Sequence, residues 1–274
     1  MAPTKPAVSY AYSAGSRSLQ LQEVKGGPAT GEFPFGAGST TGERALPCPR
    51  TFYMTDTCVT QSLWEHVMGS SDGHSGADLP MVGASWYSIV NDDTGFLVRI
   101  NSHRSLLGAV RQQLGLPQQA HARFRLPTEV EWEFAARGGE YWRDTSNMPW
   151  SGSATVEDVA WCDYAAGPGR PRTPGTHAHP VGQKLPNALG LFDMSGNVWE
   201  WCQDVYTADI NAIPSDGTAA TGESDERVLR GGCHHNWPQH CTVAKRYEIG
   251  ADTQGDTAIG FRLVLEVDSA APKL

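Results

Sequence analysis

The chain has 274 residues, of which 39% are hydrophobic and 19% are charged, and this composition is that of an ordinary globular protein. The formal net charge of −9 repels phosphate backbones, so we expect no nucleic-acid partner. No apolar run approaches the roughly 20 residues of a membrane helix, which predicts no membrane insertion. The first residues lack a charged segment followed by an apolar one, and no signal peptide is predicted.

Four segments show the apolar period of amphipathic helices. In chain order they are residues 61–68, a stretch from Ser85 that Gly95 interrupts, residues 106–114, and a stretch from Thr128 that ends at Gly138. The last of them has the clearest signal, because Thr128 and Glu131 match a capping box and acidic residues lie at the positive end of the helix.

Short β-type runs bounded by turn residues lie at 52–54, 198–201, 228–230 and 260–265. The 30 Gly and 18 Pro predict a loop-rich protein. A few helices with scattered strands indicate the α+β class. We expect residues 1–17 to be a flexible N-terminus, residues 18–266 a single domain, and residues 267–274 a tail.

Four sequence blocks occur in a specific order. They read CVTQSLW at 58–64, RLPTEVEWEFAARGG at 125–139, NALGLFDMSGNVWEW at 187–201, and RVLRGG at 227–232, followed by GFR at 260–262. Together they resemble the formylglycine-generating-enzyme (sulfatase-modifying factor) family. The resemblance implies a C-type lectin fold with small twisted antiparallel sheets, few helices and much irregular structure.

The residues after the RVLRGG block decide between an enzyme and a binding protein. In the copper-dependent oxidases that the chain resembles, two cysteines five residues apart bind the metal, and the matching positions here are Asn236 and Cys241. An amide cannot replace a thiolate in a copper(I) site, so we expect no catalytic residues and no required cofactor. The alternative is a divergent metal-dependent oxidase that uses Cys241 with Cys233 and the neighbouring histidines. Against a metal site, the adjacent His234 and His235 point to opposite sides if the chain is extended.

Residues 231–264 resemble the variable region of proteins diversified by retroelements. Fixed Pro-Gln, Cys and Ala-x-Arg landmarks stand between Arg-Gly-Gly and Gly-Phe-Arg-Leu-Val. Adenine mutagenesis in such systems does not reach Lys, Glu, Gln, Met or Trp. The expected recognition face comprises twelve residues of reachable types and Trp237 as an aromatic anchor: His234, His235, Asn236, Trp237, His240, Tyr247, Ile249, Gly250, Thr253, Gly255, Asp256, Thr257 and Ala258. The alternative is an ordinary loop that is not diversified.

A non-enzymatic, ligand-binding protein follows as the predicted function. The expected partner is an unidentified macromolecule, in our interpretation a protein, and the resemblance implies display at a cell or virion surface. An exposed face of this kind does not contribute to the core, so it can vary while the scaffold stays folded.

The NALGLFDMSGNVWEW block also allows a structural calcium ion. The resemblance implies Asp193, Gly196, Val198 and Glu200 as ligands, and hard oxygen donors suit calcium. In the alternative, Asp193 and Glu200 satisfy buried backbone donors or arginines. We expect Trp199 and Trp201 in the core, and Arg246 and Arg262 to hold the sheet and loops together through hydrogen bonds.

Overall fold

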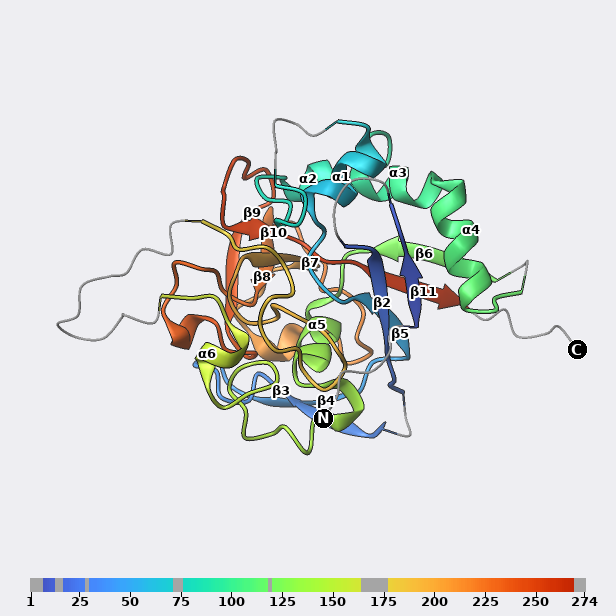
Figure 1. Ribbon diagram of the computed structural model, residues 1–274. Helices are drawn as coiled ribbons and strands as arrows, with labels where there is room; N and C mark the ends of the chain where they lie inside the picture. Colours follow the sequence, from blue (N-terminus) through green and yellow to red (C-terminus); the bar gives the residue numbers. More distant parts are fainter. Residues whose placement is uncertain are drawn as a thin grey trace, which may run out of the picture.

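Two sheets organise the fold (Figure 1). The protein is represented by a computed structural model that describes residues 7–12, 17–27, 30–70, 76–117, 120–163 and 177–268. The five-stranded sheet contains, in spatial order, β1 (Val8–Tyr10), β2 (Leu19–Val24), β5 (Phe52–Thr55), β11 (Val264–Asp268) and β6 (His121–Arg125). The four-stranded sheet contains β10 (Ile259–Gly260), β7 (Trp199–Val205), β8 (Glu226–Arg230) and β9 (Arg246–Gly250). All pairings are antiparallel except the short pairing of β10 with β7.

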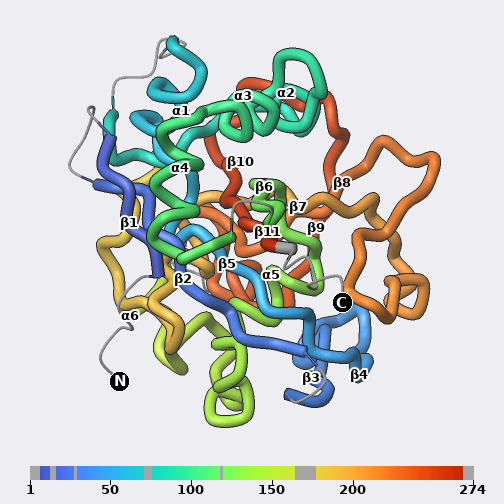
Figure 2. Tube along the Cα trace, turned by 90° about the vertical axis from the view of Figure 1, so that its right-hand side faces the viewer, coloured from blue at the N-terminus to red at the C-terminus, as the bar shows by residue number. Residues whose placement is uncertain are grey.

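Four helices form a layer over one side of the two sheets, as Figures 1 and 2 show. They are α1 (Gln61–Met68), α2 (Trp86–Val90), α3 (Phe96–Ser102) and α4 (Arg104–Gln113). Their apolar residues share one core with the sheets, in which Trp64 stacks on Phe96 at a ring distance of 5.2 Å. Helix α2 lies next to the four-stranded sheet, where the Trp86 indole donates to Cys202 O of β7. The expected helix at 61–68 is confirmed, with Thr60 as its N-cap. The helix expected from Ser85 ends earlier than Gly95, because α2 stops at Val90. Gly95 is instead the N-cap of α3, a separate helix that the sequence pattern did not distinguish from α2.

A second core surrounds α5 (Glu129–Ala136) between the four-stranded sheet and the hairpin of β3 (Glu32–Phe35) and β4 (Arg44–Pro47). This hairpin lies on the side of the molecule away from α1–α4 (Figure 2). The predicted capping box is confirmed, because Thr128 Oγ1 accepts from Glu131 N and the Glu131 carboxylate accepts from Thr128 N. All eight residues of α5 are buried, so the helix is surrounded by protein. A short α6 (Val156–Val159) lies further along the chain.

The expected strand at 260–265 is wrong in its middle. Residues 261–263 are not β structure, because the chain leaves the four-stranded sheet after β10 and enters the five-stranded sheet at β11. Between the two strands Arg262 is fully buried and binds Glu200 of β7. The strands β1–β4, β6 and β9 were not foreseen, and the runs at 52–54, 198–201 and 228–230 correspond to β5, β7 and β8. The α+β class is confirmed.

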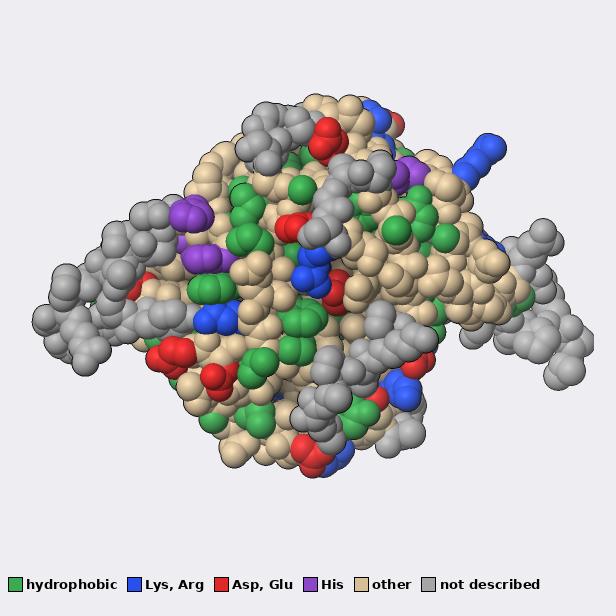
Figure 3. All heavy atoms as spheres, in the orientation of Figure 1, with side chains coloured by type: hydrophobic (Ala, Val, Ile, Leu, Met, Phe, Trp, Pro, Cys, Tyr) green, Lys and Arg blue, Asp and Glu red, His purple; other side chains and the backbone are tan. Residues whose placement is uncertain are grey.

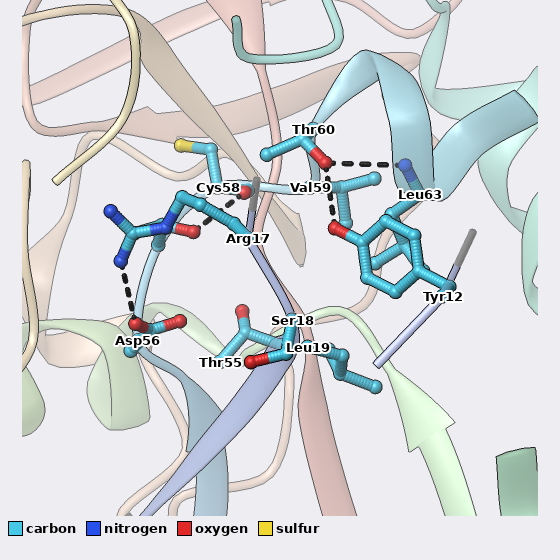
Figure 4. A pocket seen from close by; sticks show the side chains of 11 residues that line it. Tyr12, Arg17, Ser18, Leu19, Thr55, Asp56, Cys58, Val59, Thr60 and Leu63 are labelled. Carbon is cyan, nitrogen blue, oxygen red and sulfur yellow. Dashed lines mark hydrogen bonds and ion pairs between the residues drawn. The ribbon is translucent and has the colours of Figure 1, made fainter. Parts of the chain in front are cut away.

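The expectation that residues 1–17 are flexible is wrong for residues 7–12 and Arg17. Val8 is 1% exposed, and β1 pairs with β2. Figure 4 shows a small cavity of about 10 Å³ where Tyr12 meets Thr60 (3.0 Å between hydroxyl oxygens) and Arg17 meets Asp56 (3.0 Å). It has room for about one water molecule. The expected tail also begins later, since β11 extends to Asp268; residues 1–6, 13–16 and 269–274 lie outside the described residues.

The single-domain expectation for residues 18–266 stays a prediction. Across the described residues, no helix combines the length and the apolar character that crossing a membrane needs.

Candidate functional site

A pocket of about 310 Å³ opens on the four-stranded sheet, beside the segment that follows Arg-Gly-Gly. Seven of the thirteen residues expected on the recognition face line it: His235, Asn236, His240, Tyr247, Ile249, Asp256 and Ala258. Trp199, Leu229, Lys245 and Ile259 complete the lining. The structure therefore gathers residues spread over 60 positions of sequence into one concave surface.

The strand register explains the apolar floor of the pocket. Leu229 of β8 pairs with Tyr247 of β9, and Ile259 of β10 pairs with Trp199 of β7. The rings of Trp199 and Tyr247 stack at 5.3 Å with an interplanar angle of 26°. Because side chains alternate across a strand, Tyr247 and Ile249 project from the same face of β9.

The opposite face of the same sheet is bound to α5 by buried ion pairs. Arg230 and Arg246 pair across β8 and β9, and both reach the carboxylate of Glu129, at 3.2 and 2.7 Å. On β7, Glu200 accepts hydrogen bonds from Trp132 of α5 and from Arg262. The predicted structural roles of Arg246 and Arg262 are confirmed, and the pocket lies on a sheet that is fixed from behind.

The rim of the pocket comes from the segment between Cys233 and Lys245. Gly232 starts it at φ +74°, and a Cβ there would lie 2.6 Å from the Cys241 sulfur, so only glycine fits. Asn236 Oδ1 accepts from Cys233 N at 3.0 Å and holds the turn. Burial and the charge of Lys245 lower the pKa of His240, which favours its neutral form at pH 7.

Two residues expected on the recognition face are buried: His234, which does not line the pocket, and Ala258, which does. Their role in binding stays a prediction. His234 is 4% exposed, and both its backbone N and its ring Nδ1 lie within hydrogen-bond distance of Asn197 O, at 2.8 and 3.0 Å. Ala258 is 3% exposed and donates its N–H to Asp256 Oδ1. Asn197 adopts φ 64° and holds the segment in place.

The other expected face residues do not line the pocket. Trp237 is 42% exposed, Gly255 and Thr257 are exposed, and Gly250 and Thr253 are half-buried. The pocket therefore occupies only part of the surface that residues 234–258 present.

Sequence reasoning missed four lining residues. Lys245 was set aside because mutagenesis of adenines does not produce lysine, and Trp199 was assigned to the core alone. Trp199 is 7% exposed, so it is a core residue that also forms the pocket floor. The alternation of side chains along 198–201 could have suggested that Trp199 and Trp201 share one face of a sheet. The residues that Trp199 meets on β9 and β10 depend on long-range strand register, which the sequence pattern does not give.

A cluster of histidines lies beside the segment 233–236. His179 stacks on Trp161 at 3.9 Å, and the Lys184 ammonium lies 4.2 Å from the centre of the same indole ring. Burial, His235, His179 and His177 lower the pKa of His234. Figure 3 shows histidine side chains gathered next to hydrophobic side chains on this face of the molecule. Burial and neighbouring positive or imidazole groups also lower the pKa of His179, so His179 and His234 share the same direction of shift.

The cysteines of the oxidase alternative are buried thiols. Burial raises the pKa of Cys233 to about 12, and its sulfur lies 3.1 Å from Asn236 Oδ1 and 3.4 Å from His235 Nε2. A hydrogen bond with the Cys162 thiol, together with burial, raises the pKa of Cys241 well above its usual range. In the metal-free protein these surroundings therefore favour the neutral thiols.

The four expected calcium ligands do not fit the ion as a set. Asp193 Oδ1 is buried without a hydrogen-bond partner, which suits a cation. The Glu200 carboxylate, however, already accepts four hydrogen bonds, two from Arg262 and one each from Trp132 and Cys58. Within residues 7–268, outside the undescribed gaps, no group of three or more His, Cys, Asp or Glu is placed to hold a metal ion. Calcium binding through Asp193, Gly196, Val198 and Glu200 stays a prediction, and the contacts of Glu200 match the arginine-partner alternative.

These features define an α+β protein with a C-type lectin fold of the formylglycine-generating-enzyme type. Residues 25–267 match the family model described as a sulfatase-modifying factor enzyme 1-like domain, and the chain belongs to this family. It is similar to the formylglycine-generating enzyme of Thermomonospora curvata, with 38% identity over 44% of this chain and 43% of that protein. The mouse formylglycine-generating enzyme is 30% identical over 67% of this chain and 50% of that protein. The chain thus spans about half the length of these relatives.

Two solved structures resemble the chain over nearly its whole length. Treponema denticola variable protein 1 superposes with a TM-score of 0.68 and 25% identity, covering 94% of this chain and 98% of that one. PvdO from Pseudomonas aeruginosa superposes with a TM-score of 0.65 and 20% identity, covering 96% and 99%. The second likeness concerns the fold alone.

Proposed function

We propose that the chain is a non-enzymatic ligand-binding protein that presents a variable recognition face on a rigid C-type lectin scaffold. The observation that carries this proposal is the pocket, because seven residues chosen from sequence type and position line one concave surface. The sheet below it is anchored from its other face by Glu129, Arg230 and Arg246. Substitutions in the pocket therefore leave the buried ion pairs intact.

The similarity to a protein named as a variable protein supports the same function. The proposed partner is a macromolecule, in our interpretation a protein, because the expected recognition face also includes exposed residues outside the pocket, Trp237 and Thr257 among them. A surface of this breadth suits an interface with an aromatic anchor. Display at a cell or virion surface is part of the proposal.

The DNA around the gene tests the diversification step. We expect a reverse transcriptase gene and an adenine-rich near-copy of codons 231–264, with mismatches at the codons of the exposed pocket residues. If neither element lies near the gene, the variable-face function is overturned.

A competing function is a divergent metal-dependent oxidase that uses Cys241 and Cys233. The names of the relatives favour it, since several are formylglycine-generating enzymes. Titration of the reduced protein with copper(I) separates the two functions. Tight, stoichiometric binding to thiolates would support the oxidase and overturn our proposal, whereas we expect no saturable binding because Asn236 stands at one of the two metal-ligand positions of the oxidases.

A further inference from the structure

The pocket has a chemistry that defines its ligand more closely than the proposed function does, and the inference rests on that function. We propose that the pocket binds an acidic peptide segment of a protein partner, with an aromatic side chain inserted over Trp199 and a carboxylate next to Lys245. The volume of about 310 Å³ is at the lower end of the roughly 300–1,000 Å³ of small-molecule sites. It suits one large side chain and its neighbour.

The floor selects an aromatic side chain. Trp199 and Tyr247 stack at 5.3 Å, and Leu229, Ile249 and Ile259 surround them. Tyr247 is 46% exposed, so much of its ring is available for contact. Aromatic rings gain from offset or edge-to-face packing on other rings, in addition to the apolar area that they bury.

One position of the rim, Lys245, offers a cation to a negatively charged group of the ligand. The charged or titratable groups of the rim are Lys245, His235, His240 and Asp256. Burial and the charge of Lys245 both lower the pKa of His240. Among the described residues, no carboxylate lies within ion-pair distance of the Lys245 ammonium.

The one carboxylate of the rim is already in use. Asp256 Oδ1 accepts the Ala258 N–H at 2.8 Å, which fixes the turn before β10. This hydrogen bond leaves the charge of Asp256 in place, so the rim holds one ammonium and one carboxylate, and among the described residues no ion pair joins Lys245 to Asp256. A local positive group in an acidic protein favours a partner with carboxylates at this point.

Three peptides that differ in one feature each test the proposal: Ac-Glu-Trp-Glu-NH2, Ac-Lys-Trp-Lys-NH2 and Ac-Glu-Ala-Glu-NH2. Dissociation constants are measured by NMR titration of the full chain labelled with ¹⁵N. We expect the first peptide to bind roughly threefold tighter than the second, with a preference that weakens at high salt. The third should show no saturable binding, because it lacks the aromatic anchor.

Two variants assign the effect to the pocket. Lys245→Gln should remove the preference between the two tryptophan peptides, whereas the control Lys25→Gln, at an exposed lysine outside the pocket, should keep it. Tyr247→Ala should raise the dissociation constant of Ac-Glu-Trp-Glu-NH2 by roughly fivefold or more.

The proposed ligand chemistry would be overturned if the lysine peptide bound as tightly as Ac-Glu-Trp-Glu-NH2 or more tightly, or if the alanine peptide bound. It would also be overturned if the preference between the two tryptophan peptides survived Lys245→Gln. Absence of binding by all three peptides would overturn it as well. None of these results depends on the flanking DNA, so failure of the ligand chemistry and failure of the proposed function are distinguishable.

Discussion

Replacing Glu200 by Gln should destabilise the protein severely. Its carboxylate is fully buried and accepts from Arg262 Nε at 2.6 Å and Nη2 at 2.7 Å, and from Trp132 Nε1 at 2.6 Å. Glutamine leaves the buried Arg262 guanidinium without a counter-charge. Its NH2 group is itself a donor, so it cannot accept the hydrogen bonds of Arg262 and Trp132 that one carboxylate oxygen accepted. Removing one partner of a buried ion pair costs about 3–5 kcal/mol. For a chain of this size the melting temperature should fall by roughly 6–20 °C.

The same substitution at an exposed ion pair is the matched control. Glu266 is 50% exposed and lies 3.2 Å from Arg125, so Glu266→Gln should cost at most about 1 kcal/mol. Urea unfolding followed by tryptophan fluorescence and circular dichroism measures both. The double variant Glu200→Gln with Arg262→Met should cost less than the sum of its single changes, because no unpaired charge remains. Equal costs for the two Glu→Gln variants, or strict additivity in the double variant, would refute this reasoning.

Three further predictions follow from burial and charge. Replacing the exposed His235 and Tyr247 by Ser should change stability by less than about 1 kcal/mol, whereas His234→Ala should cost about 1–3 kcal/mol in the same thermal melt. Burial and neighbouring Glu129 raise the pKa of Asp204 from 3.8 to about 7, so the protonated acid stabilises the fold at low pH and this contribution is lost as the pH rises through 7. Unfolding free energy should therefore fall by about 1 kcal/mol from pH 6 to 8, and a slope unchanged in Asp204→Asn would contradict this origin. Excess EDTA should leave the melting temperature unchanged, because the Glu200 carboxylate is occupied; a drop reversed by calcium would show that the ion binds.

The parts of the fold that could be predicted depend on local sequence. The caps of α1 and α5 are decided within four residues, and both helices begin where Thr60 and Thr128 indicate. The roles of Arg246 and Arg262 were also foreseeable, because a buried arginine needs carboxylate or carbonyl partners. The break between β10 and β11 was not, since it depends on which sheet each half of one apolar run joins.

The candidate site could be predicted only in part, for a related reason. Position and residue type selected Tyr247 and His235 correctly as accessible, but they could not separate His235 from His234. The alternation of neighbouring side chains already implied that one of the two points inward. Which one does so is decided by Asn197, 37 residues earlier in the chain, whose carbonyl oxygen lies within hydrogen-bond distance of His234.

In the proposed function, this arrangement limits which positions of the recognition face can change. Side chains that point from β9 into the pocket alternate with Arg246, whose guanidinium binds Glu129 behind the sheet. A substitution at Tyr247 changes only the pocket, whereas one at Arg246 leaves a buried carboxylate without its partner. The same distinction applies in the preceding segment, where His235 is exposed and His234 is tied to Asn197. In the proposed function, freedom to change ligand follows the two-residue alternation of the backbone, because only side chains that point away from α5 and Asn197 can be replaced without loss of a buried partner.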